Sequence, residues 1–304
     1  METLDGNLYE VNDETGHINC GDNVLMSADE YSELIANPKK FIWEKALPRK
    51  CKALNYPDAA DRIVNTIREY KKFSDFNAAY DQKFVNEYHV PRRAAGFLIF
   101  GFDYLFNYLR GIKEVSIDLR RRYDQVKEAI EAIEDMLGVP QYLANMDAPI
   151  DDGYVFGTTI GLLGHSILSP KQFGDIYHPN MKKVCDKNAE LGRLVNIFGE
   201  ATFARFYEYF EDIPKGVACA LVEQDDLFEM RKRLPNIAIC GGMPSAMLGN
   251  GTKEECVEYG KKLIDGLAGE GGFLMSQDKM MSYRNDAKPE NIMAIQELCR
   301  TYTG

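Results

Sequence analysis

Six short runs of apolar residues recur through the later part of the chain, and each leads into polar residues and then a helical pattern. These runs are apolar throughout rather than alternating, which is typical of strands covered on both faces. Helices between such strands make neighbouring strands parallel, so the pattern predicts a parallel sheet. The runs are Gly96–Phe100, Gly153–Phe156, Arg193–Phe198, Gly216–Val222, Asn236–Cys240 and Phe273–Met275.

The fold class that these units favour is an α/β fold of the (β/α) TIM-barrel type. The chain contains no GxGxxG, GxxxxGK[ST] or GxSxG motif, so dinucleotide-binding, P-loop and α/β-hydrolase readings have no support. A closed barrel has about eight units. The six units counted here therefore predict an incomplete barrel.

The first part of the chain follows a different pattern. Two short apolar segments near residues 8–11 and 24–26 flank a turn-rich stretch and predict a β-hairpin. A capping-box sequence at Ser27–Glu30 opens a helical block. Residues 58–88 continue it with an apolar stripe and then an aromatic one, which indicates packing or an interface rather than a cofactor site. We therefore predict two domains, 1–93 and 94–304.

Composition limits the class of protein. A net charge of −11 and a pI near 5.0 argue against binding to a nucleic-acid backbone. Seven scattered cysteines without a CxxC pair indicate reduced thiols. The N-terminus has no signal-peptide pattern, and no apolar window reaches the ~18 residues of a membrane span. We expect a cytoplasmic protein that binds neither nucleic acid nor membrane.

Polar residues directly after the predicted strands are the candidate site residues, because barrel ligands bind at the carboxyl ends of strands. His165 is a candidate acid–base, or else a loop histidine that donates to the backbone. Glu200 and Glu223 follow neighbouring strands. If their carboxylates converge, the pair would raise the pKa of one of them or hold a cation. Otherwise they are acids at helix N-termini, where the helix dipole favours a negative charge. The full set past the strand ends is Asp103, Thr158, His165, Glu200, Glu223, Gln224, Asp278 and Lys279.

Three stretches of the chain resemble the uroporphyrinogen decarboxylase superfamily, which includes corrinoid-linked methyltransferases. The first is GFDYLFNYLRG with the following IDLRRRYDQVKEAIEAI, similar to a strand–helix unit of the family. The second is HSILSPKQFGDIYHPNMKKVCD, similar to its helix with an LSP start. The third, Gly271–Asn291, is similar to its closing unit with PEN. Together they cover about residues 94–303, and the resemblance implies a (β/α) barrel enzyme.

The chain departs from both branches of that superfamily. The arginine-rich motif with which the decarboxylases bind substrate carboxylates has no counterpart, nor has their early strand with a key aspartate. Their histidine near the C-terminus falls where this chain has Gln277, Asp278 and Lys279. Zinc-dependent methyltransferases carry His-x-Cys, where this chain has Asn196 and Phe198. The resemblance therefore implies no zinc site of that kind, since zinc needs about four close ligands.

Methyl transfer involving a corrinoid, with a small methylated donor, is the function that the resemblance favours, because the carboxylate-binding residues are absent. The alternatives are decarboxylation of a porphyrinogen, a lyase reaction of tetrapyrrole biosynthesis, and a non-catalytic barrel subunit. Lys279, Arg284 and Lys288 on the rim would suit an acidic tetrapyrrole. We assign catalysis to His165, Glu200 and Asp278, and substrate binding to Asp103, Thr158, Asn196, Glu223, Gln277 and Lys279.

The expected cofactors and partners follow from the same resemblance. We predict no metal and no tightly bound cofactor, with a corrinoid carried by a partner protein. The family's first barrel units would precede residue 1, and an open sheet leaves an unpaired edge that invites association. The sequence therefore predicts a homo-oligomer, or a second chain that completes the barrel.

Overall fold

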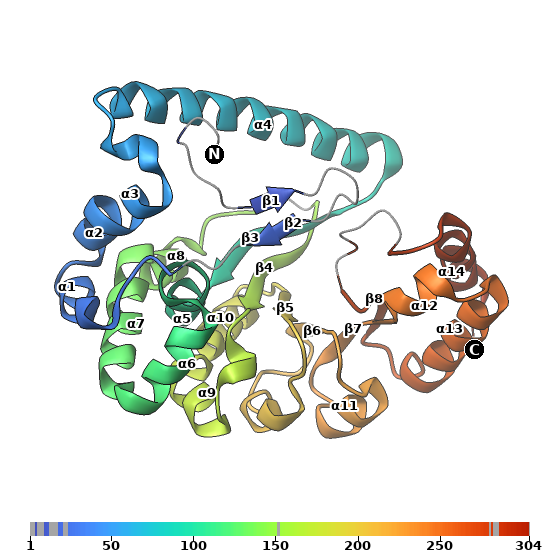
Figure 1. Cartoon of the computed structure of the whole chain (residues 1–304). Coiled ribbons are helices and arrows are strands. Elements are labelled where there is room, and N and C mark those ends of the chain that lie inside the picture. The colour runs from blue at the N-terminus through green and yellow to red at the C-terminus, as the bar shows by residue number, and fades with distance from the viewer. Residues whose placement is uncertain are drawn as a thin grey trace. The chain divides into compact units, whose positions relative to one another are not determined.

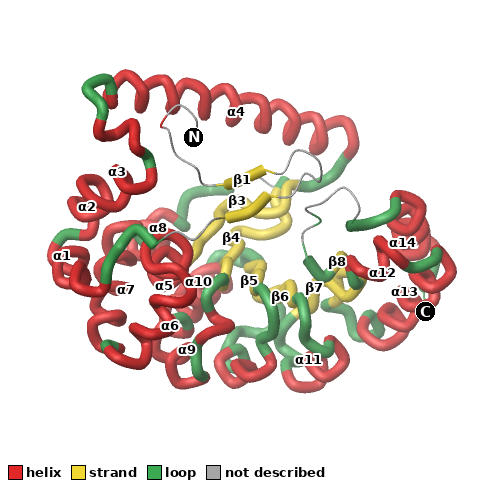
Figure 2. Tube along the Cα trace, viewed as in Figure 1, coloured by secondary structure: helices red, strands yellow, loops and turns green. Residues whose placement is uncertain are grey.

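The computed structural model describes residues 4, 9–11, 18–20, 24–150, 153–279, 281 and 286–303 (Figures 1 and 2). Within these residues the strands form a two-stranded antiparallel sheet and a six-stranded sheet in the order β3-β4-β5-β6-β7-β8. The strands are β1 Tyr9–Val11, β2 Ile18–Cys20, β3 Arg92–Ile99, β4 Tyr154–Leu162, β5 Val195–Gly199, β6 Ala218–Val222, β7 Ala238–Met243 and β8 Phe273–Gln277.

The predicted succession of strand–helix units is confirmed. Each strand of the larger sheet neighbours the next one in sequence, and the pairs from β4 to β8 are parallel in register. Gly199 at the end of β5 pairs with Leu162 at the end of β4 and with Val222 at the end of β6, so these three strands are aligned at their carboxyl ends. A sequentially ordered parallel sheet with alternating helices is consistent with a partial TIM-type barrel.

The helices of the described residues alternate with these strands (Figure 1). They are α1 Tyr31–Ala36, α2 Pro38–Phe41, α3 Leu47–Lys50, α4 Ala59–Tyr88, α5 Gly101–Tyr104, α6 Gly111–Arg121, α7 Tyr123–Leu137, α8 Val139–Asn145, α9 Pro170–Ile176, α10 His178–Glu190, α11 Leu227–Arg233, α12 Ser245–Asn250, α13 Lys253–Leu267 and α14 Pro289–Thr301. A π-helical segment, η5 (Leu105–Arg110), joins α5 to α6, and a 3₁₀ helix, η7 (Ala204–Tyr209), follows β5.

Two predicted strand positions are wrong. The second strand of the hairpin is β2, not residues 24–26; the N–H groups of Leu25 and Met26 instead donate to the Leu109 carbonyl oxygen at 2.8 and 3.0 Å. The strand expected to stop at Phe156 continues to Leu162 as β4. Glycine interrupts its apolar pattern because of close packing: a Cβ at Gly157 would lie 2.7 Å from Asn188 Oδ1.

The helix predicted over 170–191 is two helices, α9 and α10. Pro179 lies in the first turn of α10, where its missing N–H costs no hydrogen bond, but its ring prevents one continuous helix. Ser169 caps α9 by accepting from the Gln172 N–H at 3.3 Å, and the Ser169 N–H donates to Gln172 Oε1 at 2.9 Å. The LSP sequence of the family is thus a helix start in this chain.

Contacts along the chain group its residues into two compact units. One holds Ile18–Ala95 and Ile99–Val155, and the other holds Gly96–Leu98 and Phe156–Gly304. In the first unit α1 and α5 pack on α7. In the second, α11 and α13 pack on β7, and α13 packs on α14. The domain boundary after residue 93 stays a prediction.

A buried ion pair organises the core of the first unit. Asp118 in α6 is 1% exposed and accepts hydrogen bonds from Arg110 Nε at 2.7 Å and Tyr31 Oη at 2.9 Å. Arg110 also donates to the Met26 carbonyl oxygen at 2.5 Å. Burial and the negative charge of Asp118 raise the pKa of Tyr31, which stays a neutral donor. These contacts tie α1 to α6 through charged groups that water does not reach.

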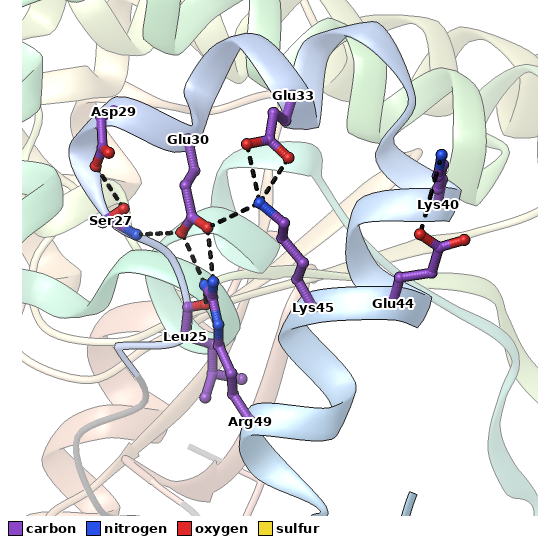
Figure 3. Close-up of polar contacts among 9 residues, drawn as sticks. All are labelled: Leu25, Ser27, Asp29, Glu30, Glu33, Lys40, Glu44, Lys45 and Arg49. Atoms are coloured by element: carbon purple, nitrogen blue, oxygen red, sulfur yellow. Dashed lines mark hydrogen bonds and ion pairs between the residues drawn. The ribbon is translucent and has the colours of Figure 1, made fainter. Parts of the chain in front are cut away.

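A second ion pair joins Glu30, directly before α1, to Arg49 in α3, and Figure 3 shows its contacts. Glu30 receives two hydrogen bonds from the Arg49 guanidinium, at 2.6 and 2.7 Å, and one from the Ser27 N–H at 2.9 Å. Lys45 lies 3.4 Å from the same carboxylate. The hydrogen bond from Arg49 is the largest reason why the pKa of Glu30 lies well below its usual range.

Glu30→Gln is expected to destabilise the protein at pH 7 by roughly 1–3 kcal/mol, less than a fully buried pair would cost because Arg49 is partly exposed. The folded-state pKa is lowered, so the ionised carboxylate stabilises the fold above the unfolded value near 4.5 and loses this effect as pH falls further. Urea unfolding at pH 7 and pH 4 measures the difference between parent and variant, which should shrink at pH 4. Glu33→Gln is the control, because Glu33 is a more exposed partner of Lys45; this change should lower the free energy of unfolding by less than ~0.5 kcal/mol. A pH-independent difference would contradict the assignment.

Among the described residues, no helix is both long and apolar enough to cross a membrane. Six described cysteines, Cys51, Cys185, Cys219, Cys240, Cys256 and Cys299, are free thiols.

Candidate active site

The loops after β5 and β6 are held together at the carboxyl end of the sheet by the carboxylate of Glu223. It accepts the Ala201 N–H at 2.7 Å, and the Gln224 N–H donates to the Ala201 carbonyl oxygen at 3.1 Å. Ala201 has φ +57°, a left-handed conformation that non-glycine residues rarely adopt and that needs such support. The two predicted strand-end acids, Glu200 and Glu223, therefore belong to one clamped loop pair.

Glu200 lies next to this clamp, and its carboxyl group has an altered affinity for protons. Glu200 is an exposed residue, but partial desolvation by the surrounding loops and the nearby charge of Glu223 raise the pKa of its carboxyl group. Glu223 has different surroundings, because its carboxylate accepts a hydrogen bond from the Ala201 backbone N–H. Two neighbouring carboxyl groups with different surroundings are a common arrangement for an acid and its charged companion. The convergence expected from their adjacent strands agrees with this geometry.

Asp225 adds a second clamp that the sequence reasoning did not select. Its carboxylate accepts from the Phe203 N–H at 3.0 Å, from Tyr207 Oη at 3.0 Å and from the Thr202 hydroxyl. These contacts fix the start of η7 against the loop after β6. The only sequence signal was its place two residues past Glu223, shared by many loop aspartates.

Asp278 follows β8 and holds the start of α12. It accepts from the Ser245 N–H at 3.0 Å and from the Ser245 hydroxyl, while its own N–H donates to the Met243 carbonyl oxygen at 2.9 Å. A carboxylate at a helix N-terminus is favoured by the unpaired N–H groups there. Asp278 thus joins the ends of β7 and β8, with one carboxylate oxygen occupied by Ser245.

A cavity of about 380 Å³ lies beside these loops, within the second unit. Four carboxylates (Glu223, Asp225, Asp226 and Asp278) and one cation (Lys262) line it, with Gln224 and Tyr259 as further polar groups. Its apolar wall consists of Val222, Leu227, Phe228, Gly242, Pro244 and Leu263. Two predicted site residues, Glu223 and Asp278, therefore share one cavity. Glu200 does not line it but lies close enough to Glu223 to be affected electrostatically.

Thr158 and Asn196 lie inside strands and on opposite faces of the sheet. Thr158 was predicted to lie past a strand end but is buried within β4. Its hydroxyl accepts a hydrogen bond from the side-chain amide of Asn188 in α10, so Thr158 faces the helices. Thr159 points to the opposite face, because side chains alternate along a strand, and it pairs in register with Asn196. Asn196 donates to the Cys219 carbonyl oxygen at 3.2 Å.

Thr159 is a residue of this inner face that the sequence reasoning missed. Its hydroxyl is buried and has no hydrogen-bond partner among the described residues. A buried polar atom of this kind is costly unless water or a ligand pairs with it. The available signal was the Thr158-Thr159 pair itself, since the two residues of a strand dipeptide always face opposite ways.

His165 is fully buried and packs among aromatic rings. Its ring stacks on Phe203 with centroids 4.6 Å apart, and its Nδ1 donates to the Leu162 carbonyl oxygen at 2.9 Å. Burial lowers the pKa of His165, so the ring is neutral at pH 7. Of the two roles that the sequence allowed, donation to the backbone is the one with this geometry, and we do not include His165 in the proposed chemistry.

The other predicted residues have these places. Asp103 is buried in the first unit and accepts the Phe100 N–H at 3.1 Å at the start of α5. Gln277, in β8, accepts from the Ser276 hydroxyl at 3.0 Å. Lys279 is exposed just beyond Asp278. Of the rim cations, Lys288 donates to the Gly251 carbonyl oxygen at 3.0 Å, and Arg284 lies outside the described residues.

The PEN motif has a structural role in this chain. Asn291 is 1% exposed and donates to the carbonyl oxygens of Leu248 and Gly251, at 3.0 and 3.1 Å. These carbonyls end α12, so Asn291 fastens α14 to that helix.

Across the described ranges, no three His, Cys, Asp or Glu side chains gather in a way that could hold a metal ion. Asn196 and Phe198 lie in β5. The absence of a His-x-Cys zinc site stays a prediction.

The fold and the acids at the strand ends define an α/β protein of partial-barrel type with its candidate site at the carboxyl end of the sheet. The chain belongs to the uroporphyrinogen decarboxylase (URO-D) family, whose model matches residues 105–302. Among solved structures it is similar to a methyltransferase from Methanosarcina mazei, with 10% sequence identity and a TM-score of 0.57 over 98% of this chain and 77% of that one. None of the curated protein sequences compared with the chain matches it.

Proposed function

We propose that this URO-D family chain is a methyltransferase that acts on a small, neutral or cationic methylated donor, with a corrinoid carried by a partner protein. The Methanosarcina mazei methyltransferase of similar fold makes methyl transfer the first chemistry to test. The observation that carries the proposal is the size and charge of the strand-end cavity.

At about 380 Å³ the cavity lies near the lower end of the ~300–1,000 Å³ range of small-molecule sites. A porphyrinogen with its four pyrroles is far larger than the ligands of such sites. Its carboxylates would also meet four acidic side chains and a single lysine, an unfavourable electrostatic match. Size and charge both favour a small donor over a porphyrinogen.

The same size argument applies to a corrinoid, whose macrocycle exceeds this cavity. The chain's own residues fit the donor, and the corrinoid would approach on its carrier protein. When bound, a corrinoid supplies the metal centre that carries the methyl group.

We assign proton transfer to Glu200, which does not line the cavity but lies beside Glu223, which does; the donor's leaving atom would therefore lie at the Glu223 end of the cavity. Removal of a methyl group from a neutral donor leaves negative charge on its oxygen, nitrogen or sulfur, and a carboxylic acid with a raised pKa is suited to protonate that atom. A quaternary ammonium donor leaves as a neutral amine and needs no proton. Glu223, held by the Ala201 N–H, places its charge beside Glu200 and contributes to the raised pKa of Glu200. Asp278 keeps the loops after β7 and β8 in place through Ser245.

A direct comparison of two assays tests this function. The purified chain is incubated with reduced free cobalamin and one methyl donor per reaction: methanol, 2-methoxyphenol, trimethylamine or tetramethylammonium. Formation of methylcobalamin is followed by its absorbance. A parallel reaction with uroporphyrinogen is followed by CO₂ release. We expect methylcobalamin with at least one donor and no CO₂. CO₂ release, or no turnover in either assay, would reject the proposal in favour of a decarboxylase or a non-catalytic subunit.

A further inference from the structure

Helix α4 presents a long apolar face that nothing in the described part of its unit covers. None of its 30 residues is buried. Seven large side chains recur at intervals of three or four residues, so they occupy one broad side of the helix. This aromatic stripe consists of Ile67, Tyr70, Phe73, Phe76, Tyr80, Phe84 and Tyr88, each between 47% and 70% exposed.

The stripe is pre-arranged for contact. Phe76 and Tyr80 lie 4.7 Å apart, and Phe84 and Tyr88 lie 5.7 Å apart, both in tilted ring geometry. Neighbouring rings that already pack on one helix lose little side-chain freedom when a second surface covers them.

Its area matches what a stable dimer needs. A large side chain of this kind offers about 150–250 Å², so seven side chains somewhat more than half exposed present roughly 600–1,000 Å². A monomer's largest apolar patch is typically about 300–600 Å². A specific interface buries about 800 Å² on each partner. One copy of the stripe against another therefore reaches the usual size.

The distribution of charge along α4 favours a second copy of the chain as its partner, in antiparallel orientation. The chain carries −11, but α4 has five basic and five acidic residues and is neutral, so it is a place where two copies meet without net repulsion. Residues 59–73 have four basic and two acidic side chains, and residues 74–88 have one basic and three acidic ones. These halves carry +2 and −2. Antiparallel pairing places opposite halves side by side, whereas parallel pairing places like halves together.

We propose that α4 pairs antiparallel with α4 of a second copy of this chain, forming a two-fold symmetric interface. Asn77 lies seven residues from both Tyr70 and Phe84, in the middle of the stripe. In an antiparallel pair centred there, the two Asn77 side chains face each other. A single polar residue in such a seam fixes register and direction.

The test uses the full chain in sedimentation equilibrium between about 1 and 100 μM. The expected species has twice the mass of the 34.5 kDa chain. Phe73→Glu with Tyr80→Glu should weaken dimerisation at least 100-fold and leave far-UV circular dichroism unchanged, because α4 has no buried residue. Ala79→Glu with Gln82→Glu, which adds the same charge on the other side of the helix, should leave the dimer intact.

Direction is read from disulfide capture compared with the parent chain. Asn77→Cys should cross-link two copies, and Ile67→Cys should not, because antiparallel copies place residue 67 far from its counterpart. A monomer at 100 μM, a dimer unaffected by the Phe73/Tyr80 change, or cross-linking through Ile67→Cys would each overturn the proposal. A monomer that dimerises only with a different protein would do the same.

Discussion

Glu200→Gln is expected to lower methyl-transfer turnover by about 10²–10⁴-fold, the usual contribution of a general acid. Glutamine keeps the shape of the side chain and removes the proton that the leaving atom of a neutral donor, such as methanol or 2-methoxyphenol, needs. The reason for selecting Glu200 is its raised pKa, which desolvation and Glu223 produce together at the end of β5. Turnover in the cobalamin assay measures the effect, and Glu208→Gln, an exposed acid of the following 3₁₀ helix, is the matched control.

The thermal stability of Glu200→Gln should not fall with its turnover and should instead equal or exceed that of the parent. A carboxyl group whose pKa is raised in the folded state costs stability while it is ionised, and this cost disappears below the unfolded value near 4.5. Glu200→Gln should therefore melt at or slightly above the parent temperature at pH 8 and at the same temperature at pH 4. Thermal unfolding at the two pH values checks this. A variant that is less stable at pH 8 and fully active would remove Glu200 from the site.

The middle of the sheet was largely predictable because β5, β6 and β7 are buried on both faces. Runs such as Gly216–Val222 are apolar without alternation, and only a covered parallel strand satisfies them. Failures occurred where glycine replaced the apolar signal. In β4, Gly157 allows Asn188 to approach, and that contact lies far along the sequence, where a local pattern does not register it.

The candidate site was harder to predict, because caps and catalytic acids share residue types and places. Asp103 and Asp278 lie after strands, as catalytic acids do, yet both receive backbone N–H groups at helix starts. His165 is in a glycine-rich segment and is nevertheless stacked on Phe203 in the core. Glu200 and Glu223 came closest to expectation, since adjacent parallel strands must bring their following residues together.

The buried acid of the first unit, Asp118, is expected to be the most sensitive position for stability. Asp118→Ala removes the carboxylate that pairs with Arg110, which is 2% exposed. Arg110 would keep the Met26 carbonyl oxygen, while Glu114, at 3.6 Å, is too far for a full replacement. Breaking a buried pair by deleting one partner costs about 3–5 kcal/mol, because the other charge stays buried without its counter-ion.

Tyr31→Phe separates this charge effect from ordinary packing. It deletes only the hydroxyl that donates to Asp118 at 2.9 Å and leaves the ion pair intact, so a loss of about 1 kcal/mol is expected. Urea unfolding of the two variants and of their combination measures both losses and their coupling. If Asp118→Ala costs no more than Tyr31→Phe, the unpaired guanidinium reaches water, and the ion pair fixes the position of α1 on α6 without contributing to stability. If the expected difference is found, the guanidinium of Arg110 stays buried without its counter-ion, and the Arg110–Asp118 pair is a core contact on which the stability of the first unit depends.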